Sequence, residues 1–83
     1  MELTYTQYFE DMLLERQIDR AWVEHTMSEP ERIEEPGDGT RHYLRRITER
    51  GERWLRVIVN VSAQRPRAVT VFFDRRLRDH ACG

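Results

Sequence analysis

The fold is decided by the stretch WLRVIVNV, residues 54–61. Its side chains alternate in character with the two-residue period of a β-strand. One face is predicted to line a core, and it carries Leu55, Val57, Val59 and Val61. The opposite face carries Trp54, Arg56, Ile58 and Asn60. This second face combines apolar and charged groups, so we expect it to contact something other than bulk water.

A preceding strand is predicted over residues 41–48, and residues 49–52 supply a glycine-containing hairpin turn. A turn with an even number of residues places Leu44 beside Val57 on the core face. The side chains that then fall on the opposite face are Tyr43, Arg45 and Ile47. An odd number reverses these faces, because a slip of one residue moves every side chain to the other side. We favour the even turn because it groups Leu44 with the valines.

A third long strand is predicted over residues 68–74. Its core-facing side chains are expected to be Val69, Val71 and Phe73, and those facing away are Thr70 and Phe72. A short edge strand at residues 3–5 would complete a sheet of four strands.

Two helices are predicted ahead of these strands. The first spans residues 6–16, where apolar side chains recur at helical spacing between Phe9 and Leu13. Thr4 and Thr6 are both suitable N-terminal caps, and the sequence does not choose between them.

The second helix has clearer boundaries. Asp19 is a good N-cap, and Ile18 before it can pack against Val23 one turn later. Pro30 cannot continue a helix, so the helix is expected to end near Met27 to Glu29.

This order of elements predicts an α+β domain, with two N-terminal helices packed on one face of a three- to four-stranded antiparallel sheet. Residues 1–83 fit one domain, and residues 75–83 are expected to form a flexible C-terminal tail. The face away from the helices would present Tyr43, Ile47, Trp54, Ile58 and Phe72. We expect this apolar face to be covered by the tail, by a second copy of the chain or by another protein.

Charge is distributed unevenly along the chain. Residues 1–40 contain eleven acidic and three basic side chains, a net charge of −8, whereas residues 41–83 contain eleven arginines and four acidic side chains, a net charge of +7. All fourteen basic residues are arginine, whose planar guanidinium suits both carboxylates and phosphates. The asymmetry indicates either a basic face that attracts phosphates or two halves that attract each other within one fold.

Composition also narrows the function classes. No apolar run approaches the ~18 residues that span a bilayer, residues 1–4 lack the features of a secretory signal, and Cys82 has no second cysteine to pair with. We therefore expect a cytoplasmic protein. The spacing of the ligand-type residues fits no zinc site; these are His25, His42, His80 and Cys82. With no phosphate-binding or dinucleotide motif either, we predict neither a metal nor a cofactor.

Several landmarks follow one another in a recognisable order between Leu3 and Asp74. They are Glu15-Arg16-Gln17-Ile18, Val23, Pro30, Gly37-Asp38-Gly39, Arg41-His42-Tyr43, Leu55 to Val59 and Val69-Thr70-Val71. In this order they resemble a small bacterial domain family of unassigned function that is grouped with BrnT-like and RelE-like toxins. The resemblance implies a two-layer α+β fold, cleavage of RNA and neutralisation by an antitoxin.

The resemblance also implies site residues. The family carries a histidine where this chain has Tyr8 and an arginine near Met12, and its usual glycine is replaced by Gln17. The positions that match are Arg16, Arg41, Tyr43 and Arg56. The candidate catalytic residues are Tyr8, His42 and Arg56, with His80 as a second histidine that could carry a proton.

RNA cleavage without a metal needs a group that takes the 2′-hydroxyl proton and cations that stabilise charge on the phosphate. In the favoured register Arg45 and Arg56 are cross-strand neighbours beside aromatic rings on which bases can stack. The candidate residues for binding RNA or a partner are Arg16, Arg41, Tyr43, Arg45, Ile47, Trp54, Ile58 and Phe72.

Two functions from different classes fit these observations. The favoured one is a toxin-like domain that binds a partner through its arginine and aromatic sheet face, the partner being an antitoxin, another protein or a second copy of the chain. The alternative is a RelE-like, metal-independent ribonuclease. Neither function involves a membrane.

Overall fold

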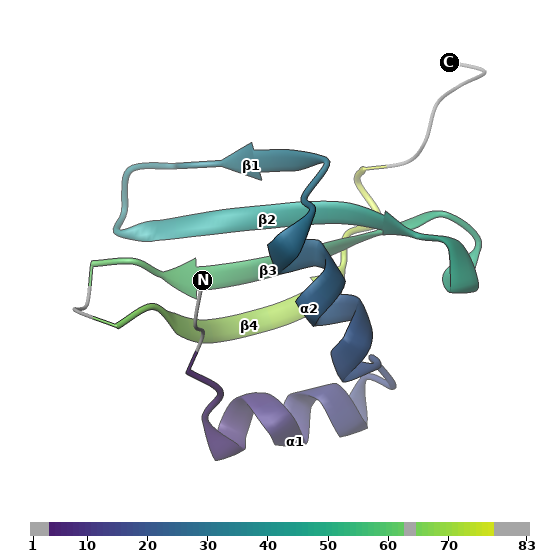
Figure 1. Cartoon of the computed structure of the whole chain (residues 1–83), viewed down its shortest axis with the longest axis horizontal. Coiled ribbons are helices and arrows are strands. Elements are labelled where there is room, and N and C mark those ends of the chain that lie inside the picture. The colour runs from purple at the N-terminus through teal and green to yellow at the C-terminus, as the bar shows by residue number, and fades with distance from the viewer. Residues whose placement is uncertain (1–3, 63–64, 78–83) are drawn as a thin grey trace.

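The computed structural model describes residues 4–62 and 65–77. Within them the chain forms two helices and four strands, in the order α1 (Gln7–Glu15), α2 (Arg20–Ser28), β1 (Arg32–Glu34), β2 (Thr40–Ile47), β3 (Arg53–Asn60) and β4 (Arg67–Phe73). The strands form one antiparallel sheet in the order β1-β2-β3-β4. Helix α2 lies across β2 and β3, and α1 packs beside β4 (Figure 1). The predicted α+β architecture is confirmed.

Both helices begin at side-chain caps. Thr6 caps α1, since its Oγ1 accepts a hydrogen bond from the N–H of Phe9 at 3.1 Å. Asp19 caps α2 as predicted, because Oδ1 accepts from the N–H of Ala21 at 2.9 Å. Thr4, the other candidate cap, instead forms a single parallel bridge with Arg67 of β4. The edge strand predicted at residues 3–5 is therefore reduced to one bridge among the described residues, and β1 supplies the fourth strand.

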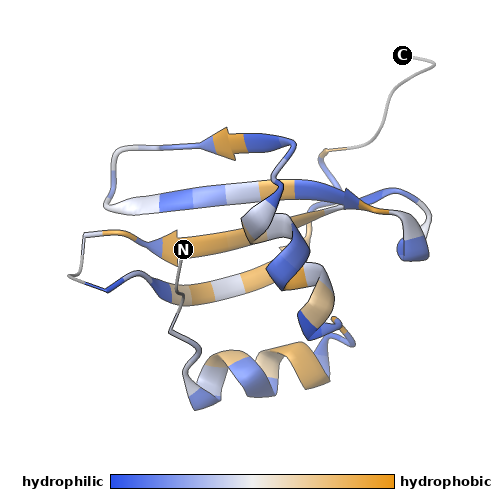
Figure 2. Cartoon of the chain, viewed as in Figure 1, coloured by the Kyte–Doolittle hydropathy of each residue, from blue (hydrophilic) through white to orange (hydrophobic). Residues whose placement is uncertain are grey.

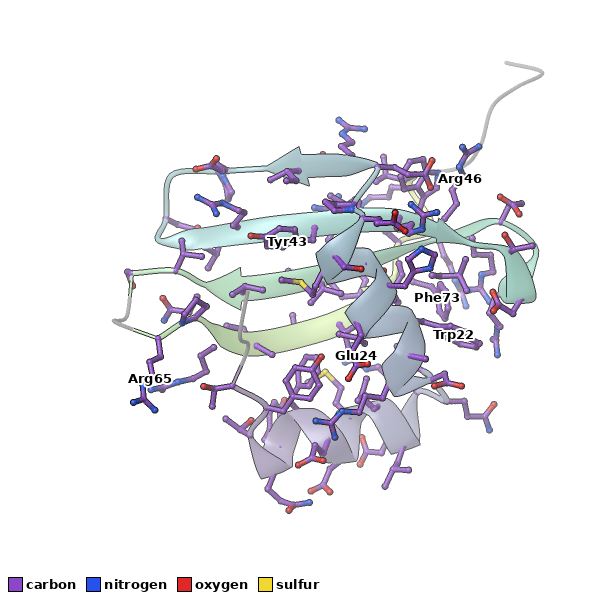
Figure 3. The ribbon with its side chains drawn as sticks, in the orientation of Figure 1. Trp22, Glu24, Tyr43, Arg46, Arg65 and Phe73 are labelled. Atoms are coloured by element: carbon purple, nitrogen blue, oxygen red, sulfur yellow. The ribbon has the colours of Figure 1, made fainter. Side chains whose placement is uncertain are left out.

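The core lies between the helices and one face of the sheet. Phe9, Val23, Val57, Val59 and Val71 are fully buried there. Figure 2 shows apolar residues concentrated on β3 and β4, whereas β2 is mainly hydrophilic. Trp22 of α2 and Phe73 of β4 close one end of this core, with their ring centroids 6.2 Å apart (Figure 3).

The register between β2 and β3 differs from the favoured prediction. Tyr43 pairs with Val57 and Ile47 pairs with Arg53, so the connection from Thr48 to Glu52 has an odd number of residues. Tyr43 and Ile47 consequently point into the helix-side core, where they are 4% and 2% exposed. The prediction that placed them on the opposite face is wrong.

The geometry of the turn explains this register. Thr48–Arg50 form one turn of 3₁₀-helix, and Gly51 and Glu52 then adopt left-handed conformations, with φ of 69° and 65°. A 3₁₀ turn followed by two left-handed residues takes five positions, and glycine accepts such a φ without steric cost.

A β-bulge changes the orientation of one predicted core residue. The register shifts between Ile58, which pairs with Thr70, and Val59, which pairs with Ala68. Val69 is therefore the extra residue and is 41% exposed, while Ala68 is buried. The prediction that Val69 faces the core is wrong, because the bulge assigns that position to Ala68.

The described C-terminal residues continue past β4 as a turn. The N–H of Leu77 donates to the carbonyl of Asp74 at 3.3 Å. Most of the tail predicted over residues 75–83 lies outside the described residues, as do His80 and Cys82. Neither described helix has the length and apolar character needed to cross a membrane.

The observed register leads to a stability prediction. Ile47→Ala is expected to lower the free energy of unfolding by about 2–4 kcal/mol, because it leaves a cavity in the core. Ile33→Ala removes the same atoms from a side chain that is 49% exposed on β1, and its expected cost is below about 1 kcal/mol. Urea unfolding of both variants tests this, and equal losses of stability would contradict the register.

Candidate functional site

The sheet has one face that points away from α1 and α2, which is called the open face below. Strand alternation and the observed pairing place eight of its side chains: Arg32 and Glu34 of β1, His42, Leu44 and Arg46 of β2, and Trp54, Arg56 and Ile58 of β3. Phe72 of β4 joins them, because Phe73 beside it faces Trp22 on the helix side. The predicted residues Trp54, Arg56, Ile58, His42 and Phe72 are thus brought onto one face.

Arg56 forms the centre of this face. Its Nε donates to Asp74 Oδ2 at 2.8 Å, and its Nη1 donates to Glu34 Oε1 at 2.9 Å. The side chains of Arg56 and Asp74 are 8% and 2% exposed, so this is a buried ion pair. Nη1 also lies 2.6 Å from Nδ1 of His42. One arginine therefore connects β1, β2, β3 and the residue that follows β4.

The contact with Arg56 determines which ring nitrogen of His42 accepts a hydrogen bond. A guanidinium can only donate hydrogen bonds, so Nδ1 of His42 must accept and the ring proton must lie on Nε2. Nε2 faces Oγ1 of Thr40 at 3.4 Å, and that hydroxyl donates to Asp38 Oδ1. Donors and acceptors hence follow one direction from Arg56 to Asp38.

Leu44 is buried on the open face and not in the helix-side core. It is fully buried, although it is absent from the cluster that packs under the helices. Its cross-strand neighbours are Arg56 on β3 and Arg32 on β1, whose aliphatic stems can cover an apolar side chain. The prediction that Leu44 packs beside the valines is wrong, because the odd turn pairs Leu44 with Arg56 and not with Val57.

The carboxyl groups around Arg56 are held ionised. Burial of Asp74 acts to raise its pKa, but hydrogen bonds from the Arg76 backbone and from the Arg56 and Arg76 side chains together lower that pKa below its ordinary value. The hydrogen bond from Arg56 is the largest of the effects that lower the pKa of Glu34. Both groups therefore carry negative charge at neutral pH.

The other arginines of the open face also contact carboxylates. Arg46 Nη2 donates to Glu31 Oε1 at 2.7 Å, and Arg32 Nε lies 3.0 Å from Glu34. Arg46 in addition lies over the ring of Trp54, 5.6 Å from its centroid. Acidic residues of the first half of the chain thus pair with arginines of the second half, as Glu31 does with Arg46 and Glu34 with Arg56. Of the two readings of the charge asymmetry, these contacts support attraction within the fold.

Several predicted site residues lie elsewhere. Arg45 pairs with Leu55, not Arg56, and donates to the carbonyl of Glu29 at 2.6 Å. Its predicted position beside Arg56 is therefore wrong, again because of the odd turn. Tyr8 is 71% exposed on α1, whereas His42 and Arg56 lie on the opposite side of the sheet.

Arg16 and Arg41, which match the family pattern, make contacts within the fold. Arg16 Nη1 donates to the carbonyl of Val71 at 2.7 Å, at the outer edge of β4. Arg41 donates to the hydroxyl of Tyr43 at 3.3 Å and lies 3.5 Å from Glu35. Neither arginine belongs to the open face.

Sequence reasoning missed Glu34 and Asp74, the two partners of Arg56. Both lie at the ends of strands, where an acidic residue carries no distinctive signal. Among the described residues, no group of three or more histidine, cysteine or acidic side chains is arranged to hold a metal.

The buried ion pair leads to a pH prediction. Asp74→Asn is expected to lower the free energy of unfolding at pH 7 by about 3 kcal/mol, the lower end for breaking a buried pair because Glu34 still faces Arg56. Since the pKa of Asp74 is lower in the folded state, its stabilisation is complete above the unfolded-state pKa, near 4, and is lost as the pH falls through the folded-state pKa.

The difference between parent and variant should therefore shrink when urea unfolding is measured at pH 3 in place of pH 7. Glu15→Gln, on the exposed side of α1, is the control and should change stability little at either pH. A difference that stays constant with pH would contradict the ionised pair.

Comparison with known proteins places the chain in a family. Searches among curated proteins and among solved structures found no match. The profile of a family described as a domain of unknown function (DUF4258) matches residues 5–73, which include every helix and strand described above. The match agrees with the predicted resemblance to a small family of unassigned function, and the link to BrnT-like and RelE-like toxins stays a prediction. Because the match covers most of the sequence, the chain belongs to the DUF4258 family.

Proposed function

We propose that this domain binds a protein partner and that the open face is its contact surface. The observation that carries the proposal is the grouping of Trp54, Ile58 and Phe72, all partly exposed, around the buried Arg56. Tryptophan and arginine are the residues that most often dominate protein–protein binding energy. A patch of partly buried aromatic side chains with a polar rim is typical of such interfaces.

The charges on this face favour a protein over a nucleic acid. Binding to a phosphate backbone depends on cations that exchange their counterions for phosphates. Arg32, Arg46 and Arg56 each contact a carboxylate of this same chain. A nucleic acid would have to compete with those carboxylates, whereas an apolar protein surface would leave the pairs in place.

The resemblance to BrnT-like and RelE-like toxins supplies a class of partner, namely an antitoxin. Under this proposal the toxin-like ancestry explains the fold, and the open face provides the binding surface for the antitoxin.

Site-specific photocrosslinking tests the contact surface. A chain carrying p-benzoylphenylalanine at Phe72 is expected to form one discrete adduct in an extract of its source cells. Excess unlabelled parent chain should compete for that adduct, while the Trp54→Ala variant should compete several-fold less well, because it lacks a central aromatic contact.

The matched control carries the crosslinker at Leu14, which is 79% exposed on α1. It should form no adduct of the same mass. Adducts that form equally from both positions, or that Trp54→Ala displaces as well as the parent does, would exclude the open face as the specific surface.

The contact between His42 and Arg56 favours a second candidate, a metal-independent ribonuclease. It places an imidazole and a guanidinium 2.6 Å apart, and these are groups that move protons and stabilise phosphate charge. Nδ1 is already occupied by Arg56, however, and the opposite nitrogen carries a proton, so the ring is not poised to accept one. We therefore rank this candidate second.

RNA incubated with the pure chain, with and without ribosomes, separates the two functions. We expect no cleavage in either case, because neither His42 nitrogen is available as a base. Cleavage that His42→Ala abolishes and Tyr8→Phe leaves intact would replace the binding proposal with the ribonuclease.

A further inference from the structure

Two arginines lie over the ring of Phe73, at the end of the sheet beside the turn between β2 and β3. The guanidinium carbon of Arg53 is 4.8 Å from the ring centroid, and that of Arg50 is 5.3 Å from it. The attraction of a guanidinium to a ring is electrostatic and needs no hydrogen-bond acceptor. Within residues 4–62 and 65–77 neither arginine makes a hydrogen bond or an ion pair. Their N–H donors therefore remain available.

A pocket with a volume of about 510 Å³ joins this pair of arginines to the open face. Its lining includes Arg53 and the adjacent Trp54, whose side chain belongs to the open face. Asp74 also lines the pocket, but its carboxylate already contacts Arg56 and Arg76. The volume falls within the range of ligand sites in proteins. A segment that contacts Trp54 can thus continue through the pocket to Arg53.

The remaining charges around the pocket fit a single carboxylate. Arg75 is a second lining arginine that makes no ion pair in the described part of the chain. The acidic residues of the turn that also lack an ion pair there are Glu49 and Glu52. Arg50, Arg53 and Arg75 outnumber them by one, so one added carboxylate balances the charge. A nucleic-acid backbone carries a charge at every nucleotide and would be repelled by both glutamates.

We propose that Arg50 and Arg53 bind the carboxylate of an acidic side chain in the protein partner, next to the apolar part of that partner that contacts Trp54. This inference rests on the proposed protein-binding function and specifies the chemistry of the partner segment. The recognised feature is an apolar residue beside an aspartate or glutamate. The planar fork of an arginine suits this acceptor, because it can donate two parallel hydrogen bonds to one carboxylate.

NMR with two matched dipeptides tests this chemistry. N-acetyl-leucyl-glutamyl-amide carries an apolar side chain and a carboxylate, and N-acetyl-leucyl-glutaminyl-amide differs from it only by an amide in place of that carboxylate. The glutamyl dipeptide is expected to shift the Nε–H signals of Arg50 and Arg53 and the Trp54 indole signal, with a Kd on the order of millimolar. The glutaminyl dipeptide should bind several-fold more weakly. Raising the salt from about 20 mM to about 300 mM should weaken binding of the glutamyl dipeptide alone.

Arginine variants assign the site. Arg50→Gln and Arg53→Gln should each weaken binding of the glutamyl dipeptide several-fold, because each removes one of the two cations. Arg65→Gln is the matched control, since Arg65 is exposed, makes no ion pair in the described part either and lies away from Phe73 (Figure 3). It should leave binding unchanged. Amide spectra verify that the variants fold, and the comparison of the two dipeptides on the parent chain decides the test if one does not.

Equal binding of the two dipeptides would overturn the inference, as would equal losses in Arg53→Gln and Arg65→Gln. Tighter binding of the trinucleotide UpUpU than of the glutamyl dipeptide would replace the carboxylate with a nucleic-acid phosphate. The protein-binding function has a separate readout. A specific crosslink from Phe72, for which Arg50→Gln and Arg53→Gln compete as well as the parent does, would leave that function standing without the carboxylate contact.

Discussion

The ion pairs of Arg56 are the interaction on which the open face depends. Arg56 lies on the central strand β3 and reaches Glu34 on β1 and Asp74 just beyond β4, so one side chain links both edges of the sheet. Removing an unpaired charge from water in this way would be very costly, and two carboxylates compensate it. Leu44, which is fully buried, lies directly across from Arg56 on the same face, where an arginine stem can cover an apolar side chain. Ion pairs of Arg56 therefore hold the open face together, whereas the other face is held by apolar packing against the helices.

Side chains also occupy backbone groups near the edges of the sheet. Arg16 donates to the carbonyl of Val71 on β4, and the carboxylate of Glu31 accepts from the backbone N–H of Arg46 at 2.9 Å. Groups satisfied in this way are not free to pair with the strand of another chain. Edge-to-edge association is disfavoured at these positions, which strengthens the case for a partner that approaches the open face.

The parts of the fold that were predictable from the sequence are governed by local chemistry. The cap at Asp19 and the alternation over residues 54–61 each depend on neighbours in the chain, and both hold in the structure. The β2–β3 register depends on the backbone of Gly51 and Glu52. A glutamate with φ of 65° has no sequence signature, so a five-residue turn could not be told from a four-residue one.

The same one-residue error in the predicted β2–β3 register limited what could be predicted of the site. Trp54, Arg56 and Ile58 were assigned to the correct face because the alternation within β3 is clear. The predicted residues of β2 were assigned to the wrong face, because their assignment depended on the length of the turn. The partners of Arg56 lie 18 and 22 positions away from it in the chain, beyond the reach of any periodicity. Their identity changes the chemistry, because arginines that suggest a phosphate site in the sequence are balanced by carboxylates in the fold. Glu34 and Asp74 also pair with Arg32 and Arg76, so the fold converts the uneven charge of the chain into a network of alternating charges that composition alone does not show.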